Sequence, residues 1–131
     1  MRQFLSIVTI LEAFTFFLAG SLHTGIKILS LQEPRIVPAM IVEGLCGIFL
    51  IIGAFTIIGH SKAAWGITLA AHIFSIAGVL LGIGALAMGR GPTTELNYYY
   101  HRTILAVLII MLIILFTAIG KSALRSGVRI E

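Results

Sequence analysis

The sequence predicts an all-α integral membrane protein in which four transmembrane helices form one antiparallel bundle. Of its 131 residues, 59% are hydrophobic and only 11% are charged, and the mean hydropathy is +1.10, which lies outside the usual composition of soluble domains. The apolar residues also gather in separate runs, each close to the ~20 residues that a helix needs to cross a hydrocarbon core of ~30 Å. Helices are the expected spanning elements because lipid offers free backbone groups no hydrogen-bond partner.

The predicted helices belong to a single domain over 1–131 and cover residues 4–26, 36–59, 63–88 and 103–120. The first run, which begins MRQFLSIVTILEAFTFFLAG, is too long for a secretory signal peptide and has Glu12 in its middle. We therefore expect it to remain as the first helix. Pro38 suits the first turn of the second helix, because its missing N–H would have no partner there in any case.

The connections between these runs predict how neighbouring helices are arranged. The short segment GHSK, residues 59–62, makes the second and third helices antiparallel neighbours. The third connection, GRGPTTELNYYYHR, is longer and polar, so we expect a loop there. It carries Tyr98, Tyr99 and Tyr100, which are typical of the aromatic belt at a membrane–water boundary.

The nine Lys and Arg residues divide almost evenly between the two sides of the predicted membrane. The side that holds both termini carries Arg2, Lys62, Lys121, Arg125 and Arg129. The other side carries Lys27, Arg35, Arg90 and Arg102, together with Glu33 and Glu95. The small excess predicts that both termini are cytoplasmic, in a bacterial or archaeal plasma membrane. Basic helix ends beside a lipid bilayer account for the pI of 9.7, so no nucleic-acid partner is expected.

The third helix has one face made of small residues. They recur at alternating steps of four and three, and we call the central part of this face the small-residue seam: Ala71, Ser75, Gly78, Gly82 and Ala85. In lipid, apolar burial gives helices little reason to associate, and small side chains let two backbones approach closely. We therefore expect this helix to be the most tightly packed in the bundle.

Ionisable side chains interrupt the apolar runs near the predicted midplane. Counting ~1.5 Å per residue from the inner side places Glu12 roughly 12 Å deep, His72 roughly 14 Å deep and Glu43 about 19 Å deep. Cys46 shares the face of Glu43. Interhelical hydrogen bonds that hold the bundle together are one explanation, and a proton site or polar-ligand site is another. A metal site is not expected, because no Glu is followed by His three residues later.

A second polar group is predicted at the outer surface. His23 and His101 would share a level there with several arginines, so they are candidate haem ligands, although no C-x-x-C-H attachment motif is present. The chain contains no Asp, which excludes a Ser-His-Asp triad, and we do not expect an enzyme. The single cysteine, Cys46, excludes an intramolecular disulfide.

Two segments, LAGSLHTGIKIL and VEGLCGIFLIIGAF, resemble the DoxX-type four-helix membrane proteins. The positions that carry the resemblance are Gly20, Gly25 and Lys27 in the first segment and Glu43, Gly44, Gly47, Leu50 and Gly53 in the second. The resemblance implies a small bundle of the kind that serves as a membrane subunit in quinone-linked sulfur oxidation or beside redox-stress enzymes. It also implies that Glu43 contacts a quinone head group or accepts a proton.

Three hypotheses for function follow. The first is an accessory or structural subunit that packs against partner membrane proteins or against a second copy of itself. The second is a redox-linked membrane protein that binds quinone or haem. The third is a small oligomeric carrier of protons or solutes that uses Glu12 and Glu43.

Overall fold

The computed structural model describes residues 1–91 and 94–125 of the chain, so the predicted inner Arg129 lies outside the described residues. Within this part the protein is all-helical and contains no strand. The helices are α1 (Arg2–Leu22), α2 (Val37–Ile58), α3 (Ala64–Ala87), α4 (Glu95–Phe116) and α5 (Ala118–Arg125). Helices α1 to α4 are each long and apolar enough to cross a membrane, which confirms the predicted helical class and the predicted number of candidate spans.

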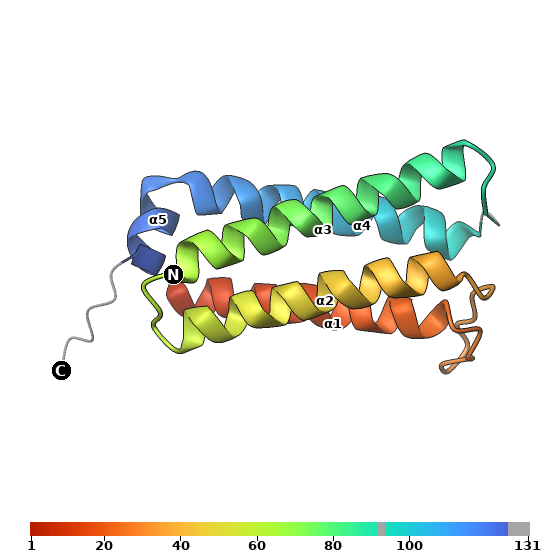
Figure 1. Cartoon of the computed structure of the whole chain (residues 1–131), viewed down its shortest axis with the longest axis horizontal. Coiled ribbons are helices and arrows are strands. Elements are labelled where there is room, and N and C mark those ends of the chain that lie inside the picture. Colours follow the sequence, from red (N-terminus) through yellow and green to blue (C-terminus); the bar gives the residue numbers. More distant parts are fainter. Residues whose placement is uncertain (92–93, 126–131) are drawn as a thin grey trace.

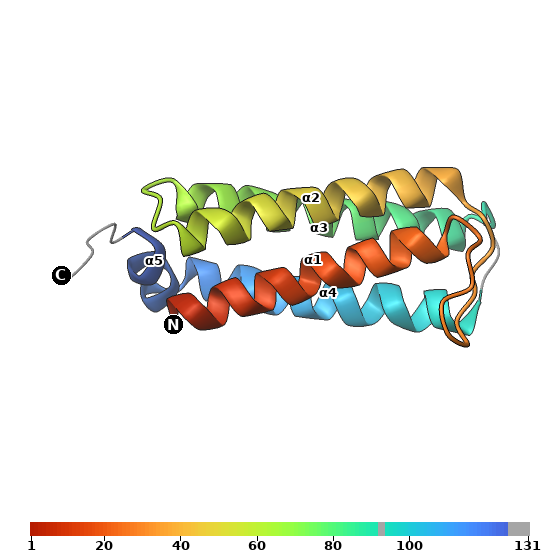
Figure 2. The same ribbon diagram turned by 90° about the horizontal axis from the view of Figure 1, so that it is seen from below.

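The four long helices lie side by side (Figures 1 and 2). The N-terminus, α5 and the connection between α2 and α3 lie at one end, which we call the α5 end. Residues 23–36, between α1 and α2, and residues 88–91, after α3, lie at the other end, which we call the loop end. Helix α1 packs mainly on α2, α2 also packs on α3, and α3 packs on α4, whereas α1 and α4 meet at few places.

Two of the predicted helix boundaries are wrong. The first helix ends at Leu22 rather than near residue 26, because the chain turns at Gly25, whose φ of +89° lies in the left-handed region that favours glycine. The fourth helix begins at Glu95 rather than near residue 103. There the Thr94 hydroxyl caps the helix by accepting a hydrogen bond from the backbone N–H of Asn97 at 3.1 Å. The predicted tyrosine-bearing loop is therefore the first part of α4.

The end of the fourth predicted helix also differs from the structure. Helix α4 ends at Phe116, and the extended backbone of Thr117 separates it from α5. Arg2 holds α5 onto the bundle, because its guanidinium donates hydrogen bonds to the carbonyls of Ala123 at 2.9 Å, Leu124 at 3.4 Å and Ile57 at 3.4 Å. These carbonyls lie in the last turns of α5 and α2, where helices carry partial negative charge.

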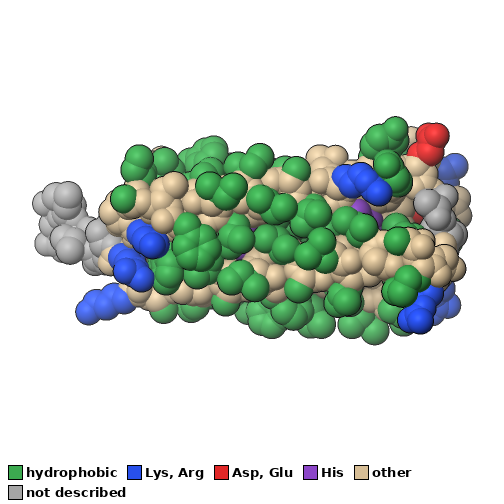
Figure 3. All heavy atoms as spheres, turned by 90° about the horizontal axis from the view of Figure 1, so that it is seen from above, with side chains coloured by type: hydrophobic (Ala, Val, Ile, Leu, Met, Phe, Trp, Pro, Cys, Tyr) green, Lys and Arg blue, Asp and Glu red, His purple; other side chains and the backbone are tan. Residues whose placement is uncertain are grey.

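The outer surface of the bundle is largely apolar (Figure 3). Large side chains such as Leu11, Phe14, Phe55 and Leu81 are at least 60% exposed. The charged side chains gather instead at the two ends of the molecule (Figure 3). An apolar exterior around an apolar interior is the pattern of helices that face lipid.

The small-residue seam of α3 faces both α2 and α4. A Cβ atom added at Gly78 would lie 2.9 Å from Cys46 Sγ of α2, and one added at Gly82 would lie 2.5 Å from His101 Nε2 of α4. These distances are shorter than ordinary van der Waals contacts, so α3 can approach its neighbours this closely only because these positions lack side chains.

The close approach at Gly82 leads to a stability prediction. Gly82→Leu should lower the free energy of unfolding by ~1–3 kcal/mol or more, because the new side chain would overlap His101. The matched control is Gly84→Leu in the same helix, where no atom lies within 4 Å of an added Cβ. Denaturant titration in detergent would measure both variants. Equal tolerance of the two substitutions would show that the seam does not pack as described.

Candidate functional site

Each of the two deeply buried glutamates pairs with a histidine from a different helix. Glu12 Oε2 on α1 lies 2.9 Å from His72 Nε2 on α3. Glu43 Oε2 on α2 lies 2.7 Å from His23 Nδ1, which directly follows α1. All four residues are at most 5% exposed. The residues predicted as one midplane cluster are thus divided, because Glu12 meets His72 whereas Glu43 meets His23.

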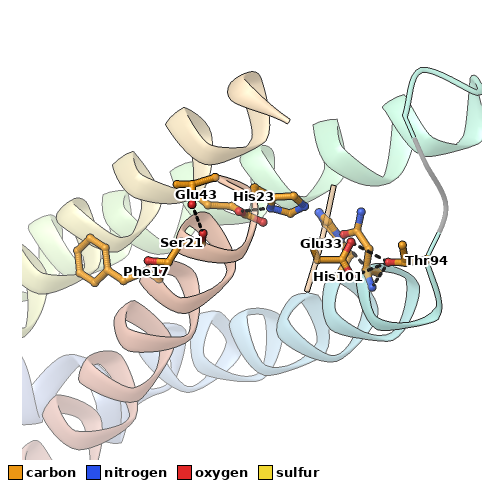
Figure 4. A network of polar contacts seen from close by, with 9 residues as sticks. Phe17, Ser21, His23, Glu33, Glu43, Thr94 and His101 are labelled. Atoms are coloured by element: carbon orange, nitrogen blue, oxygen red, sulfur yellow. Dashed lines mark hydrogen bonds and ion pairs between the residues drawn. The ribbon is translucent and has the colours of Figure 1, made fainter. Parts of the chain in front are cut away.

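Local chain geometry brings His23 and Glu43 together. His23 is the C-cap residue of α1, and its carbonyl accepts a hydrogen bond from the backbone N–H of Ile36 at 3.0 Å, just before α2 begins. Gly20 lies where α2 crosses, since a Cβ added there would be 3.5 Å from the Glu43 Cβ. This backbone hydrogen bond and the missing side chain place the second turn of α2 directly beside the end of α1. Figure 4 shows the His23 and Glu43 side chains pointing toward one another.

In His72 and His101, a backbone hydrogen bond at Nδ1 leaves Nε2 as the ring nitrogen that can interact with another group. His72 Nδ1 donates to the Thr68 carbonyl at 2.8 Å, and His101 Nδ1 donates to the Asn97 carbonyl at 2.9 Å. A carbonyl accepts only from a protonated nitrogen, so Nε2 of each ring is the position that gains or loses a proton. In His72 this Nε2 faces Glu12, so the pair shares one exchangeable proton.

His23 lies just beyond the last residue of α1, and two opposing effects act on its charge. Burial disfavours the charged form, but the hydrogen bond to Glu43 and the negative charge of Glu43 outweigh burial and raise the pKa of His23 above its usual 6.5. The protonated imidazolium has an N–H on both ring nitrogens. Once Nδ1 donates to Glu43, Nε2 is free to donate to another group.

The His23–Glu43 pair forms part of the wall of a pocket of about 260 Å³ at the loop end, which we call the outer pocket. Its walls are mostly apolar and include Val42, Leu81, Ala85 and Leu86. The polar lining residues are His23, Glu43, Arg90, Asn97 and His101. Figure 4 shows His101 at the same end of the bundle as the His23–Glu43 pair.

Three buried polar atoms of the outer pocket have no hydrogen-bond partner in the described part of the chain. They are His23 Nε2, Glu43 Oε1 and Asn97 Oδ1. A buried polar atom without a partner costs about 1–3 kcal/mol. Several such atoms on the wall of one apolar pocket indicate that another molecule supplies their partners.

Cys46 and the small-residue seam are the two remaining predicted features. The Cys46 thiol on α2 lies beside the Ser75 hydroxyl and beneath Gly78, so it fills space at the small-residue seam. Ala71 and Ser75 of the seam are buried, and Gly78, Gly82 and Ala85 line the outer pocket. Among the described residues, no group of three or more His, Cys, Asp or Glu side chains is arranged to hold a metal ion.

The outer pocket does not fit a haem held by His23 and His101. Both histidines line the pocket, as the sequence suggested, but His101 Nε2 faces Gly82, where an added Cβ would already lie 2.5 Å away. A macrocycle therefore has no room at this nitrogen. The volume of about 260 Å³ is also below the ~300–1,000 Å³ typical of pockets that enclose drug-sized ligands.

Sequence analysis missed three residues that shape the loop end. Asn97 was placed in a loop, although it lies in the first turn of α4 with its side chain in the pocket wall. Glu33, which is 4% exposed, accepts a hydrogen bond from the Thr94 hydroxyl at 2.7 Å, which ties the α1–α2 connection to the start of α4 (Figure 4). Thr94 just before Glu95 is an N-cap pattern that was available in the sequence.

Comparisons with known proteins add no relative to this description. No protein-family model matches the chain, and neither a curated protein nor a solved structure does. The resemblance to DoxX-type proteins therefore stays a prediction, and the function has to be argued from the outer pocket and the buried pairs.

Proposed function

We propose that the protein is an integral membrane protein whose four antiparallel helices present the outer pocket to a small amphipathic ligand with a quinone-type head group. The observation that carries the proposal is the set of buried polar atoms without partners, from His23, Glu43 and Asn97, on the wall of an otherwise apolar pocket. Ligand sites of this kind combine apolar walls with a few polar groups that fix orientation.

The hydrogen-bonding capacity of the pocket suits both redox forms of such a head group. Glu43 Oε1 and Asn97 Oδ1 are acceptors, which match the hydroxyl groups of a quinol. Protonated His23 donates through Nε2, which matches a quinone carbonyl. The quinone form has carbonyl oxygens and the quinol form has hydroxyl groups, so the head group finds a hydrogen-bond partner in the pocket in either form.

The shape of the pocket suits a ligand with an apolar tail. A volume of about 260 Å³ holds a ring-sized head group rather than a whole lipid-like molecule. Leu81 lines the pocket and is 70% exposed, so it marks the opening toward the apolar exterior. A tail would leave the pocket there and lie along the apolar helix surfaces, where lipid would otherwise be.

The distribution of charge supports an orientation with the α5 end in the cytoplasm of a bacterial or archaeal cell. Arg2, Lys62, Lys121 and Arg125 lie at or next to the α5 end, and Lys27, Arg35, Arg90 and Arg102 lie at or next to the loop end. The excess on the side of the termini comes from the sequence count, which adds Arg129 and gives five basic residues against four. Basic residues are retained on the cytoplasmic side of membrane proteins. Both termini would then be cytoplasmic, and the outer pocket would lie at the opposite side of the membrane.

The role as an accessory subunit stays part of this proposal. Exposed side chains such as Leu11 and Phe14 would be covered equally well by lipid, by a partner helix or by a second copy of the chain. A subunit that holds a quinone beside a redox partner would combine the first two hypotheses from the sequence. Identifying the proteins that remain bound after gentle purification tests for that partner.

Ligand binding is the first test of the outer pocket. Decylubiquinol should bind the purified protein and raise its thermal unfolding temperature, and Glu43→Gln should weaken binding by about tenfold or more because the buried carboxylate acceptor is lost. Glu95→Gln is the matched control, since Glu95 is an exposed glutamate at the start of α4. Binding that is absent in the wild type, or equal in Glu43→Gln, would contradict the proposal.

Absorption spectroscopy tests the conclusion about haem. Protein expressed with ample haem should show no Soret band after purification, because His101 Nε2 packs against Gly82. A Soret band that disappears in His101→Ala would show instead that this nitrogen ligates iron and that α3 and α4 move apart to admit the macrocycle.

A further inference from the structure

Glu12 lines a different cavity from the outer pocket, which Glu43 lines. A groove of about 500 Å³ runs between α1 and α4, the two long helices that meet at few places, and Glu12 forms part of its wall. It shares no lining residue with the outer pocket. Glu12 is 2% exposed, and its Oε1 atom has no hydrogen-bond partner among the described residues. The groove is therefore lined by a glutamate with an unsatisfied buried acceptor, and the buried hydroxyl of Tyr100, which also lines the groove, has no partner among the described residues either.

Apart from Glu12, Thr15 and Thr103, the lining of the groove is apolar or aromatic. Its wall includes Val8, Leu11, Tyr99, Tyr100 and Val107. Aromatic faces attract organic cations, and a carboxylate attracts a cation strongly where water is excluded. Among the described residues, no Lys or Arg side chain lines the groove. Charge and surface together complement a molecule that is both positively charged and apolar.

The partner of Glu12 supplies a proton that such a molecule can replace. His72 Nδ1 is committed to the Thr68 carbonyl, so one exchangeable proton resides between His72 Nε2 and Glu12 Oε2. With this proton the pair is neutral overall, and without it the pair carries one negative charge. A bound cation restores neutrality after the proton leaves, so the charge in the apolar interior is the same before and after the exchange.

Among the described residues, no other titratable group around Glu12 takes the place of His72 as the group that shares a proton with Glu12. Tyr99 and Tyr100 of α4 line the groove, but phenols are neutral near pH 7. Cys46 of α2 faces Ser75 and Gly78 of α3, and Glu43 is paired with His23. Within the described residues, the only ion pair that involves Glu12 is the one with His72.

We propose that the groove between α1 and α4 binds a lipophilic organic cation against Glu12, in exchange for the proton that Glu12 and His72 share. The ligand class is a quaternary ammonium or phosphonium ion with apolar substituents. Binding is competitive with the proton, so it strengthens as pH rises and releases one proton for each cation bound. This site is independent of the quinone-type ligand proposed for the outer pocket.

Isothermal titration calorimetry with tetraphenylphosphonium on the full chain in detergent tests the proposal. Affinity should rise as pH rises, by at most about tenfold per pH unit because one proton is exchanged, and the heats in buffers of different ionisation enthalpy should report release of that proton. Glu12→Gln should lose binding. Glu95→Gln, which removes an exposed glutamate of the same charge, should bind as the wild type does.

A second variant keeps the test sharp if Glu12→Gln fails to fold. Thr103 is exposed and lines the groove, so Thr103→Trp should fill the groove and abolish binding while Glu12 and His72 stay intact. Absence of binding to the folded wild type, binding that is independent of pH, or full binding by folded Glu12→Gln or Thr103→Trp would each overturn the proposal. Decylubiquinol binding, measured in the same preparations, reports separately on the outer pocket.

Discussion

A carboxylate inside an apolar helix bundle is tolerated only where another polar group meets it, and this constraint organises the structure. An intramembrane acidic side chain without a partner costs several kcal/mol, on the order of ~2.5–3.5 kcal/mol on insertion scales. Here Glu12 and Glu43, the glutamates within the long helices that are buried, each meet an imidazole from another helix segment. The Glu43–His23 pair joins the start of α2 to the end of α1, and the Glu12–His72 pair joins α1 to α3. The first pair thus links two helices that pack on one another, whereas the second links two helices that otherwise make little contact.

Each pair uses one carboxylate oxygen and leaves the other without a partner, and the surroundings of that free oxygen distinguish the two sites. Glu43 Oε1 lies in a pocket with His101 and Asn97, which favours a ligand that exchanges hydrogen bonds. Glu12 Oε1 lies beside an apolar groove with tyrosine rings, which favours a ligand that brings positive charge. The same pairing chemistry therefore supports different ligands at the loop end and in the middle of the bundle.

Hydropathy and small-residue spacing were enough to predict the helical class, the number of long apolar helices and the close approach at Gly82. The prediction that the third helix is the most tightly packed is wrong, because α3 is the least buried of the four long helices. Counting residues placed Glu12 and His72 at similar depths, and the structure joins them. The same count missed His23 as the partner of Glu43, because the predicted first helix continued past His23 to residue 26. In the structure, the chain turns at Gly25 and His23 is buried. The polar composition of residues 89–102 led to the prediction of a loop there although Thr94 is an N-cap signal, so Asn97 was not recognised as a pocket residue.

The pairing of buried carboxylates with imidazoles is tested most directly by solid-state NMR on the protein in lipid bilayers. With ¹⁵N-labelled histidine and carboxyl-¹³C-labelled glutamate, dipolar couplings should report direct contacts from His23 Nδ1 to Glu43 and from His72 Nε2 to Glu12. Each coupling should vanish when its own glutamate is replaced by glutamine. His60 and His101, whose Nδ1 atoms bond to backbone carbonyls, should show neither contact. A contact between His72 and Glu43, or no carboxylate contact at either histidine, would contradict this account of the bundle.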